Sequence, residues 1–263
     1  MSKTVNENNI IRFSGFSDLY HTSRPAPPEI LLKIILTYLK RDPGTVVDIG
    51  SGTGISTVIW KDIARRIIGI EPNDDMRETA QSNSKPENIS YQKGFSHQTN
   101  LPPDFADVVT ISQAFHWMDI DSTLTEVYRI LKSDGVFAVY DCDWPPVIDW
   151  VVEKAYRELK NKCDDICNTQ KEHAVRNDKN SYISRINAFG KFRFSREVVL
   201  HSLEKCTPER MFGFAISQGS MQDALKIDKS IQKDIDDFQD LVNTRCSGEF
   251  DIVFSYRLRL AIK

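Results

Sequence analysis

Long apolar runs are missing from this chain of 263 residues, and no segment approaches the length of a membrane-spanning helix. The first residues, Met1 to Asn9, are polar and lack the apolar core of a signal peptide. Basic runs are missing too, and the formal net charge of -3 argues against a nucleic-acid partner. We therefore expect a cytoplasmic protein, a monomer or a homodimer, that binds neither membranes nor nucleic acids.

Cysteine is sparse and scattered, with five residues in the chain, an odd number that does not suit a disulfide framework. Cys163 and Cys167 stand one helical turn apart, but no second pair of His or Cys residues follows at the spacing of a metal site. We predict neither disulfides nor a bound metal.

Strand and helix patterns alternate from residue 45 to residue 148. Continuous apolar runs are typical of strands buried on both faces of a sheet, and stretches with helical spacing separate them. This order predicts an α/β fold, a doubly wound and mostly parallel sheet with crossover helices. The expected strands are 45–49, 66–70, 89–93, 106–112 and 136–141, and the expected helices are 29–40, 54–63, 74–82 and 121–131, the last ended by Gly135.

The pattern changes after Asp141, where Trp144-Pro145-Pro146 interrupts the chain. The stretch that follows is polar, charged and helical in its spacing, so we predict a helical cap inserted into the sheet domain. Strand signals return at Phe192, and the final run, 250–262, alternates apolar and polar residues as an antiparallel strand with one wet face would. The predicted divisions are an N-terminal segment and helix that close the binding site (1–44), a core α/β domain (45–148), a helical substrate cap (149–191), and C-terminal strands and helices that complete the sheet (192–263).

Three glycines, Gly50, Gly52 and Gly54, directly follow the first expected strand, and Glu71 ends the second. Ligands bind at the carboxyl ends of the strands in such a sheet, and glycines let the backbone come close to them. A carboxylate about 20 residues beyond the loop is placed to accept hydrogen bonds from both ribose hydroxyls. These residues predict an adenosine-type cofactor. The alternative is that Glu71 only caps the helix that begins near Asn73.

The glycine spacing separates two cofactors of this type. A dinucleotide requires G-x-G-x-x-G, whereas this loop reads Gly50-x-Gly52-x-Gly54. Asp48 stands just before the loop, where a carboxylate would repel a pyrophosphate but can accept hydrogen bonds from an ammonium or a ribose, or hold the loop through its amides. The loop therefore favours S-adenosylmethionine, which carries no phosphate, over NAD.

Residues 46–56 together with Gly69-Ile70-Glu71-Pro72 resemble the first two motifs of class I S-adenosylmethionine-dependent methyltransferases. The stretches 112–117 and 126–135, and the opening Tyr20-x-x-x-Arg24-Pro25, are similar to the branch that contains trans-aconitate methyltransferase and related small-molecule enzymes. The resemblance implies a Rossmann-like sheet of seven strands with the last strand antiparallel.

The resemblance also implies the residues that bind the cofactor. Asp48 and the three glycines would line its methionine part, Glu71 would hold the ribose, and Met76 would pack near the adenine, although methionine at such a position is often core. Phe95 and Ser96 stand where the family brings an acidic residue to the adenine, and this chain has no carboxylate there. The full implied set is Tyr20, Arg24, Asp48, Gly50, Gly52, Gly54, Glu71, Pro72, Met76, Phe95, Ser96, Gln113 and Ala114.

His116 is the candidate catalytic residue, because it follows the fourth expected strand, where an acceptor would enter. It would act as a base or as a hydrogen-bond donor to an anion, and the alternative is a structural histidine. A carboxylate acceptor needs no base, whereas a hydroxyl or an amine needs one close by. In the cap, Arg176, Lys179 and Arg185 either grip an acidic acceptor or form a solvated charged face.

The sequence therefore predicts a methyltransferase that acts on a small molecule with a carboxylate or hydroxyl acceptor. The alternatives are a methyltransferase with a protein or other acceptor, and a protein that binds S-adenosylmethionine without catalysis.

Overall fold

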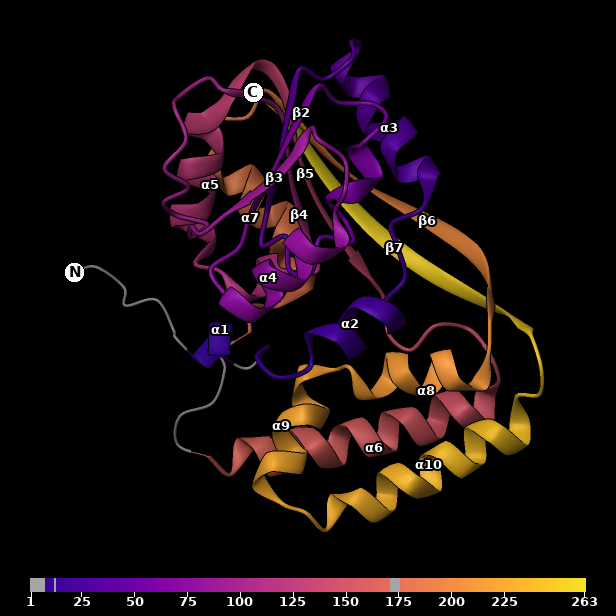
Figure 1. The fold of residues 1–263 in the computed structure, drawn as a ribbon. Helices are drawn as coiled ribbons and strands as arrows, with labels where there is room; N and C mark the ends of the chain where they lie inside the picture. Colours follow the sequence, from indigo (N-terminus) through magenta and orange to yellow (C-terminus); the bar gives the residue numbers. More distant parts are fainter. Residues whose placement is uncertain (1–7, 12, 171–175) are drawn as a thin grey trace.

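A computed structural model describes residues 8–11, 13–170 and 176–263 of the chain (Figure 1). This part folds around a seven-stranded sheet with the strand order β3-β2-β1-β4-β5-β7-β6. Strands β1 to β5 are parallel, and β7 runs antiparallel to both of its neighbours. The predicted α/β fold and its antiparallel last strand are confirmed. The strands are β1 (Thr45–Ile49), β2 (Arg66–Ile70), β3 (Ile89–Gln92), β4 (Ala106–Ser112), β5 (Leu131–Cys142), β6 (Phe194–Cys206) and β7 (Phe250–Ile262).

Helices cover both faces of the sheet, as alternating strands and helices require. On one face, α3 (Glu29–Leu39) packs its buried Leu31 and Ile35 against β1 and β5 residues. On the other, α5 (Ile120–Ile130) and α7 (Tyr182–Phe189) pack against strand residues such as Val109. Their burial explains why β1, β4 and β5 read as continuous apolar runs.

A group of helices lies beyond the carboxyl ends of the parallel strands, and the paired strands β6 and β7 extend to it (Figure 1). The group consists of α6 (Trp150–Asn168), α8 (Pro208–Ile216), α9 (Gly219–Ile227) and α10 (Ile231–Arg245). The structure thus divides the helices differently from the predicted boundaries. The segment 149–191 supplies α6 to this group and α7 to the sheet, while α8 to α10 come from the C-terminal part. None of the described helices is long and apolar enough to cross a bilayer.

The N-terminal segment contributes two short helices, α1 (Asn8–Ile11) and α2 (Ser17–Ser23). In Figure 1, α2 lies between the sheet and the helical group. The chain contacts that support this position run from α2 to α8 on one side and to α4 (Asp74–Asn83) on the other. The segment therefore lies at the carboxyl edge of the sheet, where ligands bind in this architecture.

The expected helix over 54–63 is wrong, because these residues form turns and a single short 3₁₀ helix, η1 (Val58–Trp60). The hydroxyls of Ser56 and Thr57 both donate to the Asp48 carboxylate over 2.7 Å. Serine and threonine compete with helix formation when their side chains find such partners. Apolar residues recur in this stretch because it buries Trp60 completely, although it is not a helix.

Gly135 does not cap a helix. The residue after α5, Leu131, is already extended, and β5 begins there without an intervening loop. Gly135 lies inside β5, and its neighbour Asp134 takes the left-handed conformation with φ 62°. The polar residues 132–134 form an exposed, irregular start of the strand, and a polar run before a glycine has the same sequence pattern as the end of a helix.

Candidate functional site

A cavity of about 730 Å³ lies at the carboxyl ends of β1, β2 and β4. The N-terminal segment covers one side of it with Asn9, Ile10, Phe13 and Tyr20. Ten residues of the implied cofactor set line this cavity: Tyr20, Gly50, Gly52, Glu71, Pro72, Met76, Phe95, Ser96, Gln113 and Ala114. The structure therefore brings together most of the residues that the motifs indicated, from five separate stretches of the chain.

A smaller pocket of about 50 Å³ adjoins this cavity and shares Tyr20, Gly50 and Gly52 with it. Its wall includes Arg24 and the loop residues Ser51 and Thr53. The buried Ser51 Oγ and Thr53 Oγ1 have no hydrogen-bond partner in the described structure. Buried hydroxyls without partners are rare in proteins, so they are positioned to bind a polar ligand beside the loop.

The glycine loop requires residues without a Cβ. Gly50 and Gly52 have φ values of 70° and 54°, in the left-handed region. A Cβ on Gly50 would lie 2.7 Å from Ala114 Cβ, so the loop passes closely over the residue after β4. Gly54 does not line either space. Its φ is 86°, and a Cβ there would collide with the Tyr91 hydroxyl.

Glu71 joins the loop to the tip of β2. Its Oε2 accepts a hydrogen bond from Gly52 N–H over 2.9 Å, and its Oε1 accepts one from Asn73 N–H over 2.8 Å. The cap of α4 is Asn73, whose Oδ1 accepts from Met76 N–H, so Glu71 is not the helix cap. Burial raises the pKa of Glu71 to about 7, against the lowering effect of these two hydrogen bonds. Each oxygen keeps acceptor capacity toward the cavity wall that Glu71 helps to form.

Asp48 lies outside the cavity lining, contrary to the prediction that it lines the methionine part of the cofactor. Its side chain points to the face of β1 opposite to Ile49, as the two-residue period of a strand dictates. There it accepts hydrogen bonds from Ser56 Oγ, Thr57 Oγ1 and Thr110 Oγ1 over 2.7, 2.7 and 2.8 Å. Burial raises the pKa of this carboxyl. Asp48 therefore stabilises the loop from outside the cavity, through the hydroxyls of Ser56 and Thr57.

The end of the cavity around Met76 is apolar with a few polar groups. Met76 is buried in the wall, so it is both core and cavity lining. Phe95 stacks on His97 with ring centroids 5.6 Å apart, and Ser96 Oγ accepts a hydrogen bond from Thr123 Oγ1. Carboxylates that sequence reasoning missed also line the cavity, at Asp119 and Asp121. These two residues lie at the start of α5, and no sequence motif around them indicates a ligand site.

Gln113 marks the end of β4 with a φ of 54°, which is unusual for a residue with a side chain. Its backbone N–H donates to Tyr140 O over 3.0 Å, and this bond ties the tip of β4 to β5. Strained residues of this kind cluster at functional sites, and both Gln113 and Ala114 line the cavity.

Arg24 fixes the N-terminal segment to the helical group. Its Nε donates to Ser217 Oγ over 3.1 Å, and its second guanidinium nitrogen donates to Ser217 O over 3.0 Å. The guanidinium carbon lies 4.6 Å from the centre of the Tyr20 ring and 5.2 Å from that of Trp144. From the sequence alone, Arg24 could also form only a surface ion pair, and its contacts with Ser217 and the aromatic rings contradict that alternative.

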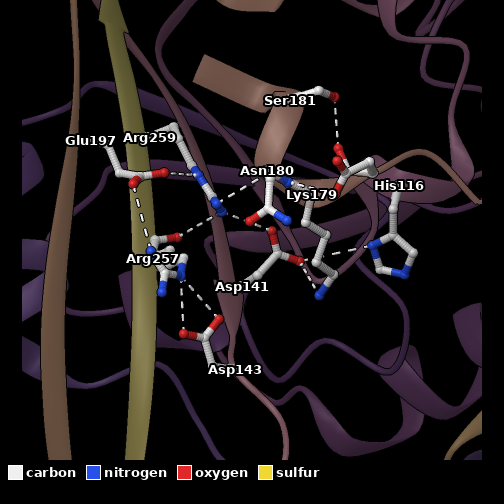
Figure 2. Close-up of polar contacts among 10 residues, drawn as sticks. His116, Asp141, Asp143, Lys179, Asn180, Ser181, Glu197, Arg257 and Arg259 are labelled. Atoms are coloured by element: carbon white, nitrogen blue, oxygen red, sulfur yellow. Dashed lines mark hydrogen bonds and ion pairs between the residues drawn. The ribbon is translucent and has the colours of Figure 1, made fainter. Parts of the chain in front are cut away.

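His116 is buried and does not line the cavity, contrary to the expectation for a residue that touches the acceptor. The short helix η2 (Phe115–Trp117) turns its ring away, and Nδ1 lies 3.8 Å from Asp141 Oδ1 (Figure 2). Trp117, beside it, does line the cavity. The structural alternative for His116 is the one that agrees with this position.

Asp141 is the centre of a buried ionic network (Figure 2). Its Oδ1 lies 2.8 Å from Lys179 Nζ, and its Oδ2 lies 3.3 Å from a guanidinium nitrogen of Arg259. Arg259, 1% exposed, also donates to Glu197 Oε2 over 2.6 Å. The network joins β5, β6 and β7 to the segment before α7. Among the described residues, no group of His, Cys, Asp and Glu could hold a metal ion.

Comparisons with known proteins agree with this architecture. Residues 47–139, less than half of the chain, match the family model described as a methyltransferase domain. The Saccharomyces cerevisiae protein named "Probable S-adenosylmethionine-dependent methyltransferase CRG1" is 28% identical over 136 residues, 50% of this chain and 47% of that protein. The uncharacterised methyltransferase YcgJ of Bacillus subtilis is 31% identical over 152 residues, 55% of this chain and 60% of that protein.

The chain spans about half the length of the curated relatives it matches. The solved structure of a candidate type II methyltransferase from Anaeromyxobacter dehalogenans has the same fold, with a TM-score of 0.68 at 16% identity over 91% of this chain and 97% of that one. Residues 47–139 are therefore similar to a methyltransferase domain, for which S-adenosylmethionine is the expected cofactor.

Proposed function

We propose that this chain transfers a methyl group from S-adenosylmethionine to a small-molecule acceptor by in-line displacement. The observation that carries the proposal is the joint position of Glu71 and Gly52, linked by a hydrogen bond at the wall of one cavity. The cavity of about 730 Å³ is covered by the N-terminal segment, and this cover supports an acceptor of small size.

The residues at the wall fit the expected cofactor. Glu71 has the acceptor oxygens that two ribose hydroxyls need, and Gly50 leaves the close approach that a Cβ would fill. The unpartnered hydroxyls of Ser51 and Thr53, near Arg24, suit the polar amino-acid end. Met76 and Phe95 supply apolar walls for the adenine. When bound, the cofactor supplies a methyl group on a sulfonium, which is an electrophile.

The chain's own contribution is to position the acceptor and to exclude water. Orientation of this kind supplies much of the catalysis in a displacement at carbon. Gln113 and Ala114 lie at the tip of β4, beside Gly50, and Tyr20 covers them from α2. His116 is buried and does not line the cavity, so we propose that it acts only by packing against Trp117, which does.

The finer predictions from the sequence stay predictions. These are the likeness to the trans-aconitate methyltransferase branch, the carboxylate or hydroxyl acceptor, the cytoplasmic location, and the monomer or homodimer. The proposed divisions of the chain follow the same motifs, with the helical group of α6 and α8 to α10 in the place of a single inserted cap.

Two measurements test the proposal. Calorimetry with S-adenosylhomocysteine and with NADH should give binding of the first compound only, and tight binding of NADH alone would overturn the cofactor. The protein is then incubated with radiolabelled S-adenosylmethionine and a deproteinised cell extract. A labelled small-molecule product is expected. Binding of S-adenosylhomocysteine without any labelled product would favour a non-catalytic binding protein.

A further inference from the structure

Asn177 enters the cavity wall from the segment between α6 and α7. Its backbone N–H donates to His116 O over 2.8 Å, and its side-chain Nδ2 donates to Met118 O over 2.8 Å. A longer contact of 3.3 Å joins Nδ2 to His116 O. Because Nδ2 is the donor atom of the amide, these two carbonyls fix its orientation and leave Oδ1 as the atom that Asn177 offers to the cavity.

The segment that carries Asn177 is held firmly. Two residues further on, Lys179 Nζ lies 2.8 Å from Asp141 Oδ1, and Lys179 O accepts a hydrogen bond from Arg259 over 3.2 Å. Figure 2 shows Asp141 and Arg259 meeting Lys179 from neighbouring strands. The buried network thus anchors this segment by its side chain and by its backbone. A hydrogen-bond acceptor on such a support is preorganised for a ligand.

The charges at the wall point in the same direction. Glu71, Asp119 and Asp121 line the cavity, and no lysine or arginine is among the described residues that do. The nearby basic side chains already have partners: Lys179 pairs with Asp141, Arg185 pairs with Asp121 of the cavity wall, and Arg176 lies above the Trp117 ring at 5.2 Å. Apart from the sulfonium of the proposed cofactor, a carboxylate acceptor would meet oxygen acceptors and no lysine or arginine among the described lining residues, and burial of an unpaired charge is costly.

We propose that the methyl acceptor is an amine, in place of the carboxylate or hydroxyl that the sequence predicted, and that Asn177 Oδ1 accepts a hydrogen bond from its N–H. This inference rests on the proposed function. The lone pair of the neutral amine forms the new N–C bond, while the C–S bond breaks and leaves its electron pair on sulfur, which becomes a thioether. The proton lost from the methylated nitrogen passes to solvent. The sequence led us to expect a base close to an amine, but an amine that has lost its proton to solvent before it binds attacks with its own lone pair. A hydroxyl would need a base within the site, and His116 does not reach the cavity.

The chemistry of the labelled product tests the acceptor. The protein is incubated with radiolabelled S-adenosylmethionine and a deproteinised cell extract, and the product is treated with alkali and analysed by mass spectrometry. We expect a base-stable N-methyl product. A methyl ester, which releases labelled methanol in alkali, or an O-methyl ether overturns the inference and leaves the proposed function intact. The absence of any product contradicts the proposed function, and the inference falls with it.

Variants of Asn177 test the contact. Asn177→Leu should raise the KM for the amine about tenfold or more, because one hydrogen-bond partner is lost from a partly buried site. The affinity of this variant for S-adenosylhomocysteine, measured by calorimetry, should stay within about twofold of the wild-type value. The control is Asn180→Ala, a neighbour outside the cavity lining, whose affinity should also stay within about twofold of wild type. If Asn177→Leu fails to fold, Asn177→Ser carries the same test. An unchanged KM for the amine in the folded variant overturns the role of Asn177.

Discussion

The Glu71 carboxylate accepts a hydrogen bond from the backbone N–H of Gly52 over 2.9 Å, so the acid at the tip of β2 holds the loop at the tip of β1. One residue therefore has two tasks: it shapes the glycine loop, and it offers acceptor oxygens at the cavity wall. A single substitution there should disturb both.

Replacement of Glu71 tests the ribose contact. Glu71→Ala should weaken the binding of S-adenosylhomocysteine by about 1–3 kcal/mol, because buried hydrogen bonds to a charged group are lost. Calorimetry measures the change, with Glu87→Gln, an exposed acid of the same type, as the control. Unchanged affinity in Glu71→Ala would mean that Glu71 serves only the loop.

The raised pKa of Glu71, about 7, predicts a pH dependence of cofactor affinity. The ionised carboxylate is the better acceptor for ribose hydroxyls, and its fraction increases from about 0.1 at pH 6 to about 0.9 at pH 8. The affinity for S-adenosylhomocysteine should therefore increase about tenfold over this range and change little above it. Glu71→Gln should remove most of this dependence. An equal slope in wild type and variant would assign the dependence to another group.

The same pKa predicts the opposite trend for stability without cofactor. The folded-state pKa of Glu71 lies above its ordinary value of 4.5, so between about pH 4.5 and 7 the folded state binds more protons than the unfolded state. This contribution to stability is full below that range and is lost as the pH rises through 7. The variant Glu71→Gln lacks this titration. Its free energy of unfolding in urea, relative to that of the wild type, should therefore increase by about 1–3 kcal/mol between pH 5 and pH 8. A constant difference between the two proteins would contradict this.

Two glycines of the loop should differ in their tolerance of alanine. At Gly52 a Cβ meets open space, so Gly52→Ala should cost only the left-handed backbone, about 1–2 kcal/mol. At Gly50 the Cβ would also lie 2.7 Å from Ala114 Cβ and 2.8 Å from Met118 Cε, which adds about 1–3 kcal/mol. The free energies of unfolding in urea make the comparison. Equal costs would show that the loop moves freely away from β4.

Two aspartates at the end of β5, Asp141 within the strand and Asp143 just after it, should contribute very differently to stability. Asp141→Asn removes a carboxylate from a network in which Arg259 is 1% exposed, and we expect a loss of about 3 kcal/mol. Asp143→Asn breaks a half-exposed pair with Arg257 and should cost less than about 1 kcal/mol. Thermal and urea unfolding of both variants test the difference, and similar costs for the two variants would contradict a buried network at Asp141.

Arg24 should control the closure of the N-terminal segment. Arg24→Ala removes two hydrogen bonds to Ser217 and the contact with the Tyr20 ring. Limited proteolysis within residues 13–24 should become several-fold faster, because local opening costs less. Arg65→Ala, an exposed arginine elsewhere, is the control. Equal cleavage of both variants would mean that packing alone holds the segment.

Much of the sheet could be predicted because its signals are local. The strands β1, β2, β4 and β7 have the predicted bounds, since continuous or alternating apolar runs depend on the neighbouring residues alone. The helix over 54–63 failed because the partner of Ser56 and Thr57 is Asp48, on another element. Apolar spacing cannot reveal such a long-range hydrogen bond.

The site was predictable where a motif fixes it and not elsewhere. Gly52 and Glu71 are close because the tips of neighbouring parallel strands meet at one edge of the sheet. His116 stands one residue from Trp117, but the short turn of η2 sends one ring into the wall and the other to the cavity. Asn177 carries no motif, and its position depends on a network assembled from three strands.

The position of β7 has a consequence for biosynthesis. This strand is made after β6 yet lies between β5 and β6, so during translation both of those strands wait with unpaired edges. Until residue 259 has left the ribosome, Asp141 also lacks its arginine. The nascent chain should therefore expose unpaired strand edges until late in synthesis, and the sheet should be completed only when β7 inserts between β5 and β6.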